Sequence, residues 1–436
     1  MSQWKKVKIG DVCKIEKGTT GIASAVPGEF PLVVTAVERK TCSTYQFDCE
    51  AVCIPLVSSS GHGKKSLNNV HYQSGKFALG TILCAVIPKN PHELDARYLH
   101  QYLQFYKDTV LVPLMKGAAN VSLSMKDIAG VEIPLPPIEK QREFSAMFVS
   151  LQEKSQQLRV ESEKQIEYAK QLRANILQDA IEGKLTADWR EKHPLKKDDP
   201  DYDAEALFQN ILDEKRKTKD ERKSSKKTSI PITDEERTFE IPGNWKWVRL
   251  GEIGSWAAGA TPVKTERKYY INGDVPWVRT GDLNDSLIFD IPEKITNLAL
   301  QECSVRLNPI GSVLIAMYGA TIGRVGLLSI PATTNQACCA CIPYQKGFNR
   351  YLFYLLIALR KQFKEKSWGA AQPNISKEII VNTIFPLPPL AEQKEIVARV
   401  EKHLETITQL ETQIATRETF TKQLMQGLLK DAFEEA

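Results

Sequence analysis

Two long segments of the chain carry apolar residues at a helical period. In residues 138 to about 185, which hold no proline and no glycine before Gly183, apolar residues recur at Phe144, Phe148, Leu151, Leu158, Ile166, Leu172 and Ile176. Residues 390 to about 433 show the same period at Ile396, Val400, Leu404, Ile407, Ile414, Leu424 and Leu428. Each segment directly follows a Pro-Pro pair, and proline is tolerated only in the first turn of a helix. The pattern predicts two helices, 138–186 and 390–436, each roughly 70 Å long at 1.5 Å per residue.

A helix of this length with a narrow apolar stripe needs a partner helix to cover the stripe. One possibility is that each helix is a separate arm that dimerises with a second copy of the protein. We favour the other arrangement, in which the two helices pack on each other within one chain as an antiparallel intramolecular coiled coil, because they match in length.

Both long helices follow a segment with short β-rich runs separated by Gly, Ser and Asn turns. In residues 1–137, strands are expected at 30–35, 51–56 and 81–87, and a helix at 95–106. In residues 244–389, a strand is expected at 275–279 and a helix at 350–363. The predicted fold class is α+β, with two mixed α/β domains separated by the two long helices.

The two halves of the chain repeat each other at their boundaries. Pro134-Leu135-Pro136-Pro137-Ile138 returns as Pro386-Leu387-Pro388-Pro389-Leu390, and Gly117-Ala118-Ala119 returns as Gly369-Ala370-Ala371, each pair 252 positions apart (134 and 386). Trp4 to Val12 resembles Trp245 to Ile253 at an offset of 241 (4 and 245). The segments between these boundaries do not match. A duplicated globular-plus-helix unit suits a partner with two-fold symmetry of its own, of which DNA is the commonest.

Residues 187–243 are expected to form a charged connector between the halves. Both charge signs are mixed there with few apolar residues, so a solvated linker is favoured over a phosphate-binding segment. A short helix is expected at 204–212, and a flexible stretch at 224–233.

Composition restricts the classes of protein. The 436 residues are 42% hydrophobic and 25% charged, as in ordinary water-soluble domains, and the formal net charge is only +5. No apolar run is long enough to span a bilayer, and the first residues lack a signal peptide. The nine cysteines lack the spacing of zinc ligands. These features predict reduced, mostly buried thiols in a cytoplasmic protein.

No catalytic motif is visible. Gly63-Lys64-Lys65-Ser66 lacks the leading glycine and the Lys-Ser spacing of a phosphate-binding loop. The chain has no Asp/Asn-Pro-Pro-Tyr/Phe motif and no Gly-x-Gly in a strand-to-helix setting, so we do not expect it to bind a methyl donor. The six histidines are scattered, and no metal site is predicted. A protein without enzymatic activity of its own is therefore predicted.

Side chains suited to DNA recognition do cluster in both modules. Cations bind phosphates, while Asn, Gln and Arg distinguish bases in the major groove. Glycine-rich loops also allow the backbone to approach a duplex closely. The candidate DNA-binding residues are Ser60, His62, Lys64, Lys65 and Asn68 in the first module, and Lys264, Arg267, Lys268, Tyr270, Arg279, Tyr318, Thr321, Arg324, Asn335 and Gln336 in the second.

Several of these segments resemble the specificity (S) subunits of Type I restriction-modification systems. The resemblance rests on the two boundary elements Pro134 to Gln141 and Pro386 to Gln393, and on four further segments: Glu182-Gly183-Lys184-Leu185-Thr186-Ala187-Asp188-Trp189-Arg190, Ile241 to Gly251, Tyr318-Gly319-Ala320-Thr321-Ile322-Gly323 and Asn335-Gln336-Ala337. It spans both halves in the same order. The sequence departs from the pattern at Ala391 and Glu392, which differ from Glu139 and Lys140. The first module also lacks a close copy of the Tyr-Gly-Ala-Thr-Ile-Gly run.

The resemblance implies a subunit without a catalytic site, in which two target-recognition domains each read one half of a bipartite DNA site. It implies that the long helices dock two methyltransferase (M) subunits, and through them restriction (R) subunits. S-adenosylmethionine, ATP and Mg would be bound by those partner subunits and no cofactor by this chain. The candidate docking residues are Gln141, Phe144, Phe148, Leu151, Gln393, Ile396, Val400 and Leu404.

Two alternatives from other classes remain. A duplicated repressor or architectural protein would bind DNA without partners, although no helix-turn-helix or zinc finger is visible. A fragment of a fused restriction-methylation enzyme would require methyl-donor motifs elsewhere.

Overall fold

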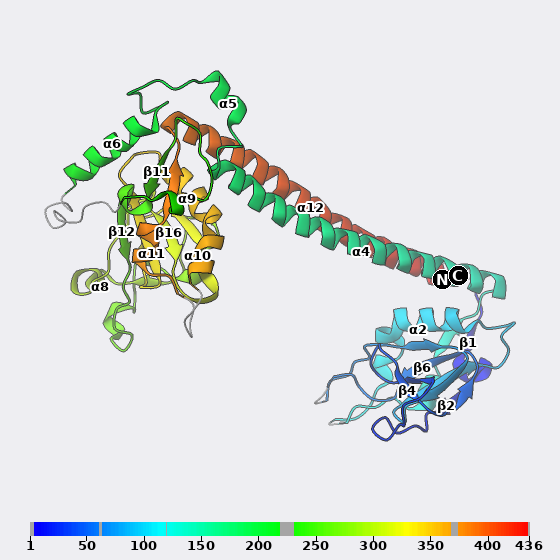
Figure 1. Ribbon diagram of the computed structural model, residues 1–436. Coiled ribbons are helices and arrows are strands. Elements are labelled where there is room, and N and C mark those ends of the chain that lie inside the picture. Colours follow the sequence, from blue (N-terminus) through cyan, green and yellow to red (C-terminus); the bar gives the residue numbers. More distant parts are fainter. Residues whose placement is uncertain (1–3, 61–62, 119, 219–230, 368–373, 435–436) are drawn as a thin grey trace. The chain divides into compact units, whose positions relative to one another are not determined.

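The computed structural model describes residues 4–60, 63–118, 120–218, 231–367 and 374–434 (Figure 1). Contacts divide the chain into two compact units. The first comprises residues 1–165 and 413–436, and the second comprises residues 166–412. Each unit therefore holds one globular module together with one part of each long helix.

The first module contains two four-stranded sheets and a two-stranded ribbon. The sheets have the strand orders β2-β9-β6-β7 and β4-β3-β8-β5, and β1 pairs with β10 in the ribbon. Its main elements are β1 (Lys6–Lys8), α1 (Ile9–Val12), β2 (Cys13–Lys17), β3 (Phe30–Val33), β4 (Lys40–Cys42), β5 (Phe47–Asp48), β6 (Ala51–Pro55), β7 (His71–Gln73), β8 (Lys76–Leu79), β9 (Leu83–Pro88), α2 (Ala96–Val110), α3 (Met125–Ala129) and β10 (Glu132–Pro134). The strands and the helix expected here are confirmed, with ends that differ by a few residues.

After its part of the first long helix, the second unit continues with the connector helices α5 (Ala187–Lys192) and α6 (Ala204–Lys217). The helix expected at 204–212 is thus present and longer, while most of the stretch expected to be flexible, 224–233, lies outside the described residues. The module that follows contains β11 (Lys246–Arg249), β12 (Gly254–Ala258), β13 (Val275–Val278), β14 (Ser286–Ile288), β15 (Lys294–Ile295), α8 (Asn297–Glu302), β16 (Val313–Ala316), β17 (Val325–Leu328), β18 (Thr333–Thr334), β19 (Cys338–Pro343), α9 (Asn349–Ala358), α10 (Arg360–Lys366), α11 (Lys377–Asn382) and β20 (Ile384–Leu387).

The two modules share one topology despite their unmatched sequences. The order β2-β9-β6-β7 of the first module corresponds to β12-β19-β16-β17 of the second, which adds β14 at one edge. The order β4-β3-β8 corresponds to β15-β13-β18. The last two strands of each order are parallel, namely β3 with β8 and β13 with β18. The ribbons β1-β10 and β11-β20 also correspond. The middles of the two halves therefore differ in sequence and agree in fold.

A buried tyrosine fixes the end of each module to the start of the following helix. Tyr98 on α2 and Tyr351 on α9 are almost completely buried, and their hydroxyls donate to the carbonyl oxygens of Pro134 and Pro386, at 3.1 Å in both cases. The proline-rich boundary motif therefore supplies a backbone acceptor, because a buried phenol must find a hydrogen-bond partner.

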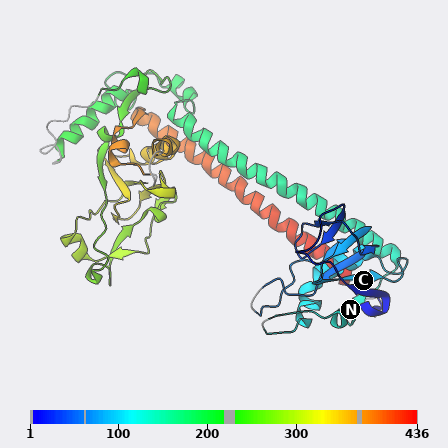
Figure 2. The same ribbon diagram turned by 60° about the horizontal axis from the view of Figure 1, so that its bottom comes forward.

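The two long helices are α4 (Ile138–Ile181) and α12 (Leu390–Glu434). In the second unit Arg173 forms an ion pair with Glu411 at 2.8 Å, and in the first unit Arg417 donates to Ser162 at 3.0 Å and Gln165 at 2.8 Å. Residues further along α4 thus contact residues nearer to the start of α12, so the two helices run in opposite directions. The antiparallel intramolecular pairing is confirmed in each unit, where the helices lie side by side (Figure 2).

Two residues of the predicted apolar stripes were assigned to the wrong face. Leu172 and Leu424 are 47% and 62% exposed, whereas Ile176, Ile396, Val400 and Ile407 are buried. The apolar period locates a helix, but neighbouring turns drift around its axis, so the same period does not fix which leucines face the partner helix.

All nine cysteines are free thiols, and seven of them are buried. The expectation of mostly buried thiols is thus confirmed. Within the part of the chain that the structure describes, none of the helices combines the length and the hydropathy that crossing a membrane requires.

Candidate nucleic-acid interface

Strand connections bring several candidate residues of the second module to one end of its sheets. The amide of Asn335 donates to the carbonyl oxygen of Val278 at 2.9 Å, which places Asn335 beside Arg279. The amide of Met317 donates to the carbonyl oxygen of Ala337 at 2.8 Å, which brings the β16–β17 turn beside Gln336. We call the group formed by Arg279, Tyr318, Asn335 and Gln336 the reading edge.

The β16–β17 turn is held rigidly at this edge. Gly319 and Gly323 adopt positive φ angles of 63° and 76°, which glycine accepts without strain. The Thr321 hydroxyl donates to the Tyr318 carbonyl oxygen at 2.9 Å, so that hydroxyl serves the turn. The Tyr318 side chain is 45% exposed, and Arg324 is exposed as well. The turn therefore presents an aromatic ring and a cation to the solvent.

An ion pair braces the same turn from the neighbouring elements. Arg360 on α10 donates through Nε to the Gly323 carbonyl oxygen at 2.8 Å and pairs with Asp285. The Asp285 carboxylate also accepts from the Val325 amide at 3.0 Å. Three segments that are distant in sequence thus fix the end of the turn.

The side chains of Gln336 and Arg279 are oriented by neighbours. The Thr261 hydroxyl donates to the amide oxygen of Gln336, which turns the NH2 group of that amide away from Thr261. Arg279 pairs with Glu293 at 2.6 Å. A phosphate bound at Arg279 would therefore compete with Glu293 for the guanidinium group.

Four further candidates lie on the segment from Lys264 to Tyr270. Lys264 and Arg267 are exposed. Lys268 pairs with Glu302 at 2.8 Å, and this carboxylate raises the pKa of the Lys268 ammonium group. The Tyr270 hydroxyl donates to the Pro262 carbonyl oxygen at 2.5 Å. Lys264 and Arg267 are thus better placed than the other two to reach a new ligand.

In the first module, the candidate residues belong to the connection between β6 and β7. Lys64, Lys65 and Asn68 are exposed. The serines of this connection are used internally, because the Ser58 hydroxyl donates to the Lys64 carbonyl oxygen at 2.5 Å and the Ser60 and Ser66 hydroxyl oxygens lie 2.7 Å apart. His62 lies outside the described residues.

The candidate docking residues on the long helices include four whose side chains are buried within this chain. Gln141, Gln393, Ile396 and Val400 are at most 2% exposed. The two glutamines donate to the carbonyl oxygens of Pro136 and Pro388, both at 2.7 Å, and so fix the first turn of each helix. These four side chains cannot form an exposed docking surface, and their repetition has a structural cause. Phe144, Phe148, Leu151 and Leu404 are partly buried.

A repeated exposed motif on the same helices escaped the sequence analysis. Tyr168-Ala169-Lys170-Gln171-Leu172 on α4 returns as Phe420-Thr421-Lys422-Gln423-Leu424 on α12, 252 positions later (168 and 420). Tyr168 and Phe420 are 65% and 63% exposed, and the two leucines also face solvent. Large apolar side chains that recur at exposed positions mark interaction surfaces. We call these two motifs the exposed helix motifs.

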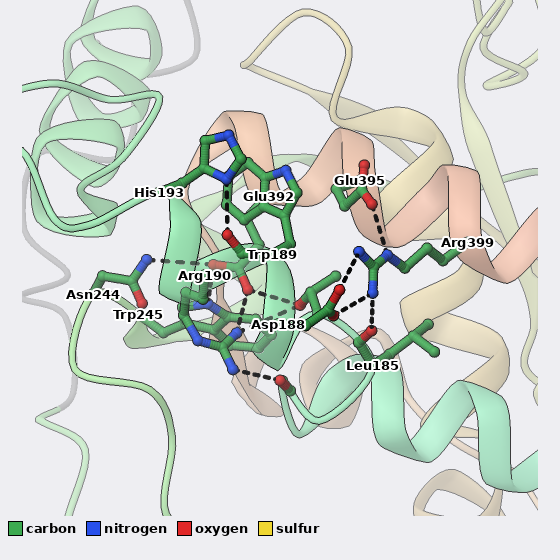
Figure 3. A network of polar contacts seen from close by, with 12 residues as sticks. Leu185, Asp188, Trp189, Arg190, His193, Asn244, Trp245, Glu392, Glu395 and Arg399 are labelled. Atoms are coloured by element: carbon green, nitrogen blue, oxygen red, sulfur yellow. Dashed lines mark hydrogen bonds and ion pairs between the residues drawn. The ribbon is translucent and has the colours of Figure 1, made fainter.

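The buried carboxylate of Glu392, near the start of α12, contacts the two ends of the connector between the modules (Figure 3). Glu392 is completely buried and forms an ion pair with Arg190. It accepts hydrogen bonds from the Thr186 hydroxyl and the Trp245 indole, both at 2.8 Å, and from the Asn244 amide at 3.3 Å. The motifs 182–190 and 241–251 therefore meet at one residue.

A second polar cluster lies beside Glu392 (Figure 3). Arg399 on α12 donates to both carboxylate oxygens of Asp188, at 2.5 and 3.1 Å, and to the Leu185 carbonyl oxygen at 2.9 Å. This guanidinium group lowers the pKa of the Asp188 carboxyl group. Lys140, the counterpart of Glu392 in the first half, is exposed and pairs with Glu143 at 2.7 Å. The difference in residue type thus follows from a difference in burial, since Lys140 lies at the surface and Glu392 is buried at the junction with the connector.

Comparison with known proteins gives a consistent result. A family model described as the Type I restriction modification DNA specificity domain matches residues 1–168 and 242–417. The EcoR124I/EcoR124II specificity subunit of Escherichia coli is 28% identical over 194 residues, which cover 43% of this chain and 48% of that subunit. The MjaIX specificity subunit of Methanocaldococcus jannaschii is 30% identical over 162 residues. This match covers 36% of the chain and 37% of the relative, so the chain matches less than half the length of these two relatives.

Other similarities extend over nearly the whole chain. The EcoDI specificity subunit of E. coli is 22% identical over 444 residues, which cover 99% of the chain and 88% of that subunit. A solved chain from a study of complex assembly and conformational transition in the type I R-M system has a TM-score of 0.62 at 21% identity, with 99% of this chain and 98% of that chain covered. The HsdS subunit from Thermoanaerobacter tengcongensis has a TM-score of 0.56 at 20% identity, with 99% and 97% covered. These two structures show that the fold is shared.

Proposed function

Because the chain belongs to the family of Type I restriction-modification DNA specificity domains, we propose that it is the sequence-reading subunit of such a complex. Each module reads one half of a bipartite DNA site, and the chain has no catalytic role. The observation that carries the proposal is the shared topology of two modules whose exposed connections differ. Two such modules can read two different half-sites on one scaffold.

The long helices dock two methyltransferase subunits, and restriction subunits join through them. The exposed helix motifs support this assignment, because the same Lys-Gln-Leu triplet follows an exposed aromatic residue in both halves. Two equal surfaces suit two copies of one partner. S-adenosylmethionine, ATP and Mg belong to the partner subunits, where adenine methylation and DNA cleavage take place.

The proposal is tested by co-expressing the chain with its cognate methyltransferase and mapping N6-methyladenine in the host genome. We expect a split motif that disappears when this chain is omitted. A stable complex that adds no methylation would contradict the function. Specific DNA binding by the chain alone, without a complex, would favour a stand-alone repressor or architectural protein.

Exchanging residues 1–137 for the first module of another family member should change one half-site only. The reason is that each module has its own sheets and its own exposed connections. Methylation mapping of the hybrid complex measures both half-sites at once. A change in both half-sites would show that the modules do not read independently.

Replacing Lys64 with Ala should weaken binding to all DNA sequences alike. Lys64 is exposed on the β6–β7 connection, and a lysine bound to a phosphate releases about one counterion. The slope of log K against log salt should fall by about 1 for the variant. Lys14→Ala is the control, because Lys14 is exposed on β2 and pairs with Glu16. A loss confined to some sequences would contradict a phosphate contact.

Lengthening both long helices together should change the spacer between half-sites without changing their letters. Seven residues inserted after Gln165 and seven after Thr412 add about 10 Å to the helix pair. This corresponds to about three base pairs at 3.4 Å each. Methylation mapping gives the new spacer. Altered half-site letters would count against the helices as the spacer element.

A further inference from the structure

The strand connections at the reading edge of the second module have counterparts in the first. The Gly18 amide donates to the carbonyl oxygen of Leu83, the first residue of β9, at 2.9 Å. In the same way, the Gly259 amide donates to the carbonyl oxygen of Cys338, the first residue of β19, at 3.0 Å. A Cβ atom on Gly18 would collide with the backbone of Leu79 and Gly80.

The same close approach recurs in the second module, where a Cβ atom on Gly259 would collide with the backbone of Thr334 and Asn335. Gly80 thus occupies the position of Asn335, and Thr81 occupies that of Gln336. Like Gln336, Thr81 is exposed, and each lies in the turn that leads into the following strand.

Backbone hydrogen bonds also show that the β6–β7 connection corresponds to the β16–β17 turn. The Leu123 amide donates to the Leu56 carbonyl oxygen, and the Ile375 amide donates to the Met317 carbonyl oxygen, both at 2.9 Å. The next residues form matching bridges, Val57 with Ser122 and Tyr318 with Asn374. These two connections therefore leave their sheets at the same point.

The two modules differ in which of these equivalent connections carries the polar side chains suited to reading bases. Before β19 the second module carries Asn335 and Gln336, whose side-chain amide oxygens accept from the Ala337 amide and the Thr261 hydroxyl, whereas before β9 the first module carries Gly80 and Thr81. The β6–β7 connection is instead the longer one and exposes Lys64, Lys65 and Asn68.

In the second module, the orientation of the Gln336 side-chain amide also restricts which base atoms it can contact. Because the Gln336 amide oxygen accepts from Thr261, the group left to face a ligand is the NH2 donor. A donor matches the acceptors of the major groove, which are N7 and O6 of guanine, N7 of adenine and O4 of thymine.

We propose that the two modules read their half-sites with different connections of the same fold. The second module uses the β18–β19 connection, where Gln336 donates to a base acceptor and Thr261 positions it. The first module uses the β6–β7 connection, with Asn68 contacting a base and Lys64 and Lys65 contacting phosphates. This inference rests on the proposed function and names the residues that would carry the specificity.

The test compares Gln336→Ala with Thr81→Ala, its counterpart, in the complex with the methyltransferase subunits. For Gln336→Ala, we expect discrimination at one base pair of the second half-site to fall roughly 2- to 13-fold, the effect of losing one neutral hydrogen bond. For Thr81→Ala we expect both half-sites to be unchanged. Asn68→Ala should relax one position of the first half-site and leave the second intact.

The positioning role of Thr261 has its own readout. Thr261→Val should reduce discrimination at the same base pair as Gln336→Ala, and Thr261→Ser, which keeps the hydroxyl, should restore it. If Thr81→Ala relaxes the first half-site, or if Gln336→Ala leaves the second unchanged, the proposal is overturned. Failure of the function itself would look different, because the unmodified complex would then place no methyl groups. Thermal melting of each variant shows that the modules remain folded.

Discussion

Replacing Phe420 and Leu424 by alanine together is expected to remove one methyltransferase subunit from the complex and leave the other bound. Both side chains are more than 60% exposed, so the chain should lose little stability. Aromatic anchors at interfaces cost about 2 kcal/mol or more when truncated, so two neighbouring truncations should weaken docking by at least 100-fold. Native mass spectrometry of the purified complex gives the stoichiometry directly.

The counterpart change, Tyr168→Ala with Leu172→Ala, is expected to have the same effect on the other copy of the partner. All four changes together should leave the chain without a methyltransferase and abolish methylation in cells. Val160→Ala and Leu410→Ala are suitable controls, because these residues are also exposed on the long helices but lie outside the exposed helix motifs. Full stoichiometry in the fourfold variant would refute the docking assignment, as would equal losses in the controls.

Replacing Glu392 by alanine is expected to lower the free energy of unfolding of the second unit by about 3–5 kcal/mol. Removing one member of a buried ion pair leaves the partner charge uncompensated, and losses of this size are typical. The indole of Trp245 and the hydroxyl of Thr186 also lose their acceptor, and both residues are buried. Urea denaturation followed by tryptophan fluorescence reports the loss.

Lys140→Ala tests the corresponding position of the first half. Lys140 is exposed and its ion pair with Glu143 lies at the surface, so the change should stay within about 0.5 kcal/mol. Glu392→Gln should fall between the two variants, because it keeps the shape of the side chain and loses the charge that faces Arg190. Similar unfolding midpoints for Glu392→Ala and Lys140→Ala would show that the buried carboxylate does not hold the connector.

Much of the fold follows from local patterns in the sequence. The two long helices begin directly after their Pro-Pro pairs, and α4 ends at Ile181, two residues before Gly183, which has a φ angle of 76°. A left-handed glycine commonly ends a helix in this way. The short strands were also expected, since they combine β-branched residues with Gly and Asn turns.

The contacts at the junction could not be predicted in the same way. Glu392 meets Thr186, Arg190 and Trp245, which are about 150 to 200 positions away along the chain. A glutamate near the start of a helix is ordinary in sequence, because negative charge is favourable there. Only the fold shows that this carboxylate is buried and therefore needs partners. The burial of the two boundary-motif glutamines, Gln141 and Gln393, is hidden in the sequence for a similar reason, since their acceptors are backbone carbonyl groups.

The correspondence between the β6–β7 connection and the β16–β17 turn was also hidden in the sequence. The two segments share no motif and differ in length, while the hydrogen bonds that define their correspondence join main-chain atoms. Backbone hydrogen bonds depend on the path of the chain and only weakly on side chains, so unrelated sequences can satisfy them.

The separation between main-chain scaffolding and exposed side chains has a consequence for how such a chain can diversify. The strands are aligned by backbone hydrogen bonds and by buried aliphatic residues, whereas Asn68, Thr81 and Gln336 are exposed at their connections. Point mutations at these positions cost little folding free energy, so the fold tolerates many of them. Loss of the buried Glu392 carboxylate would instead destabilise the second unit whatever side chains stand at these exposed positions. The exposed positions can therefore vary in sequence while the scaffold beneath them keeps its fold.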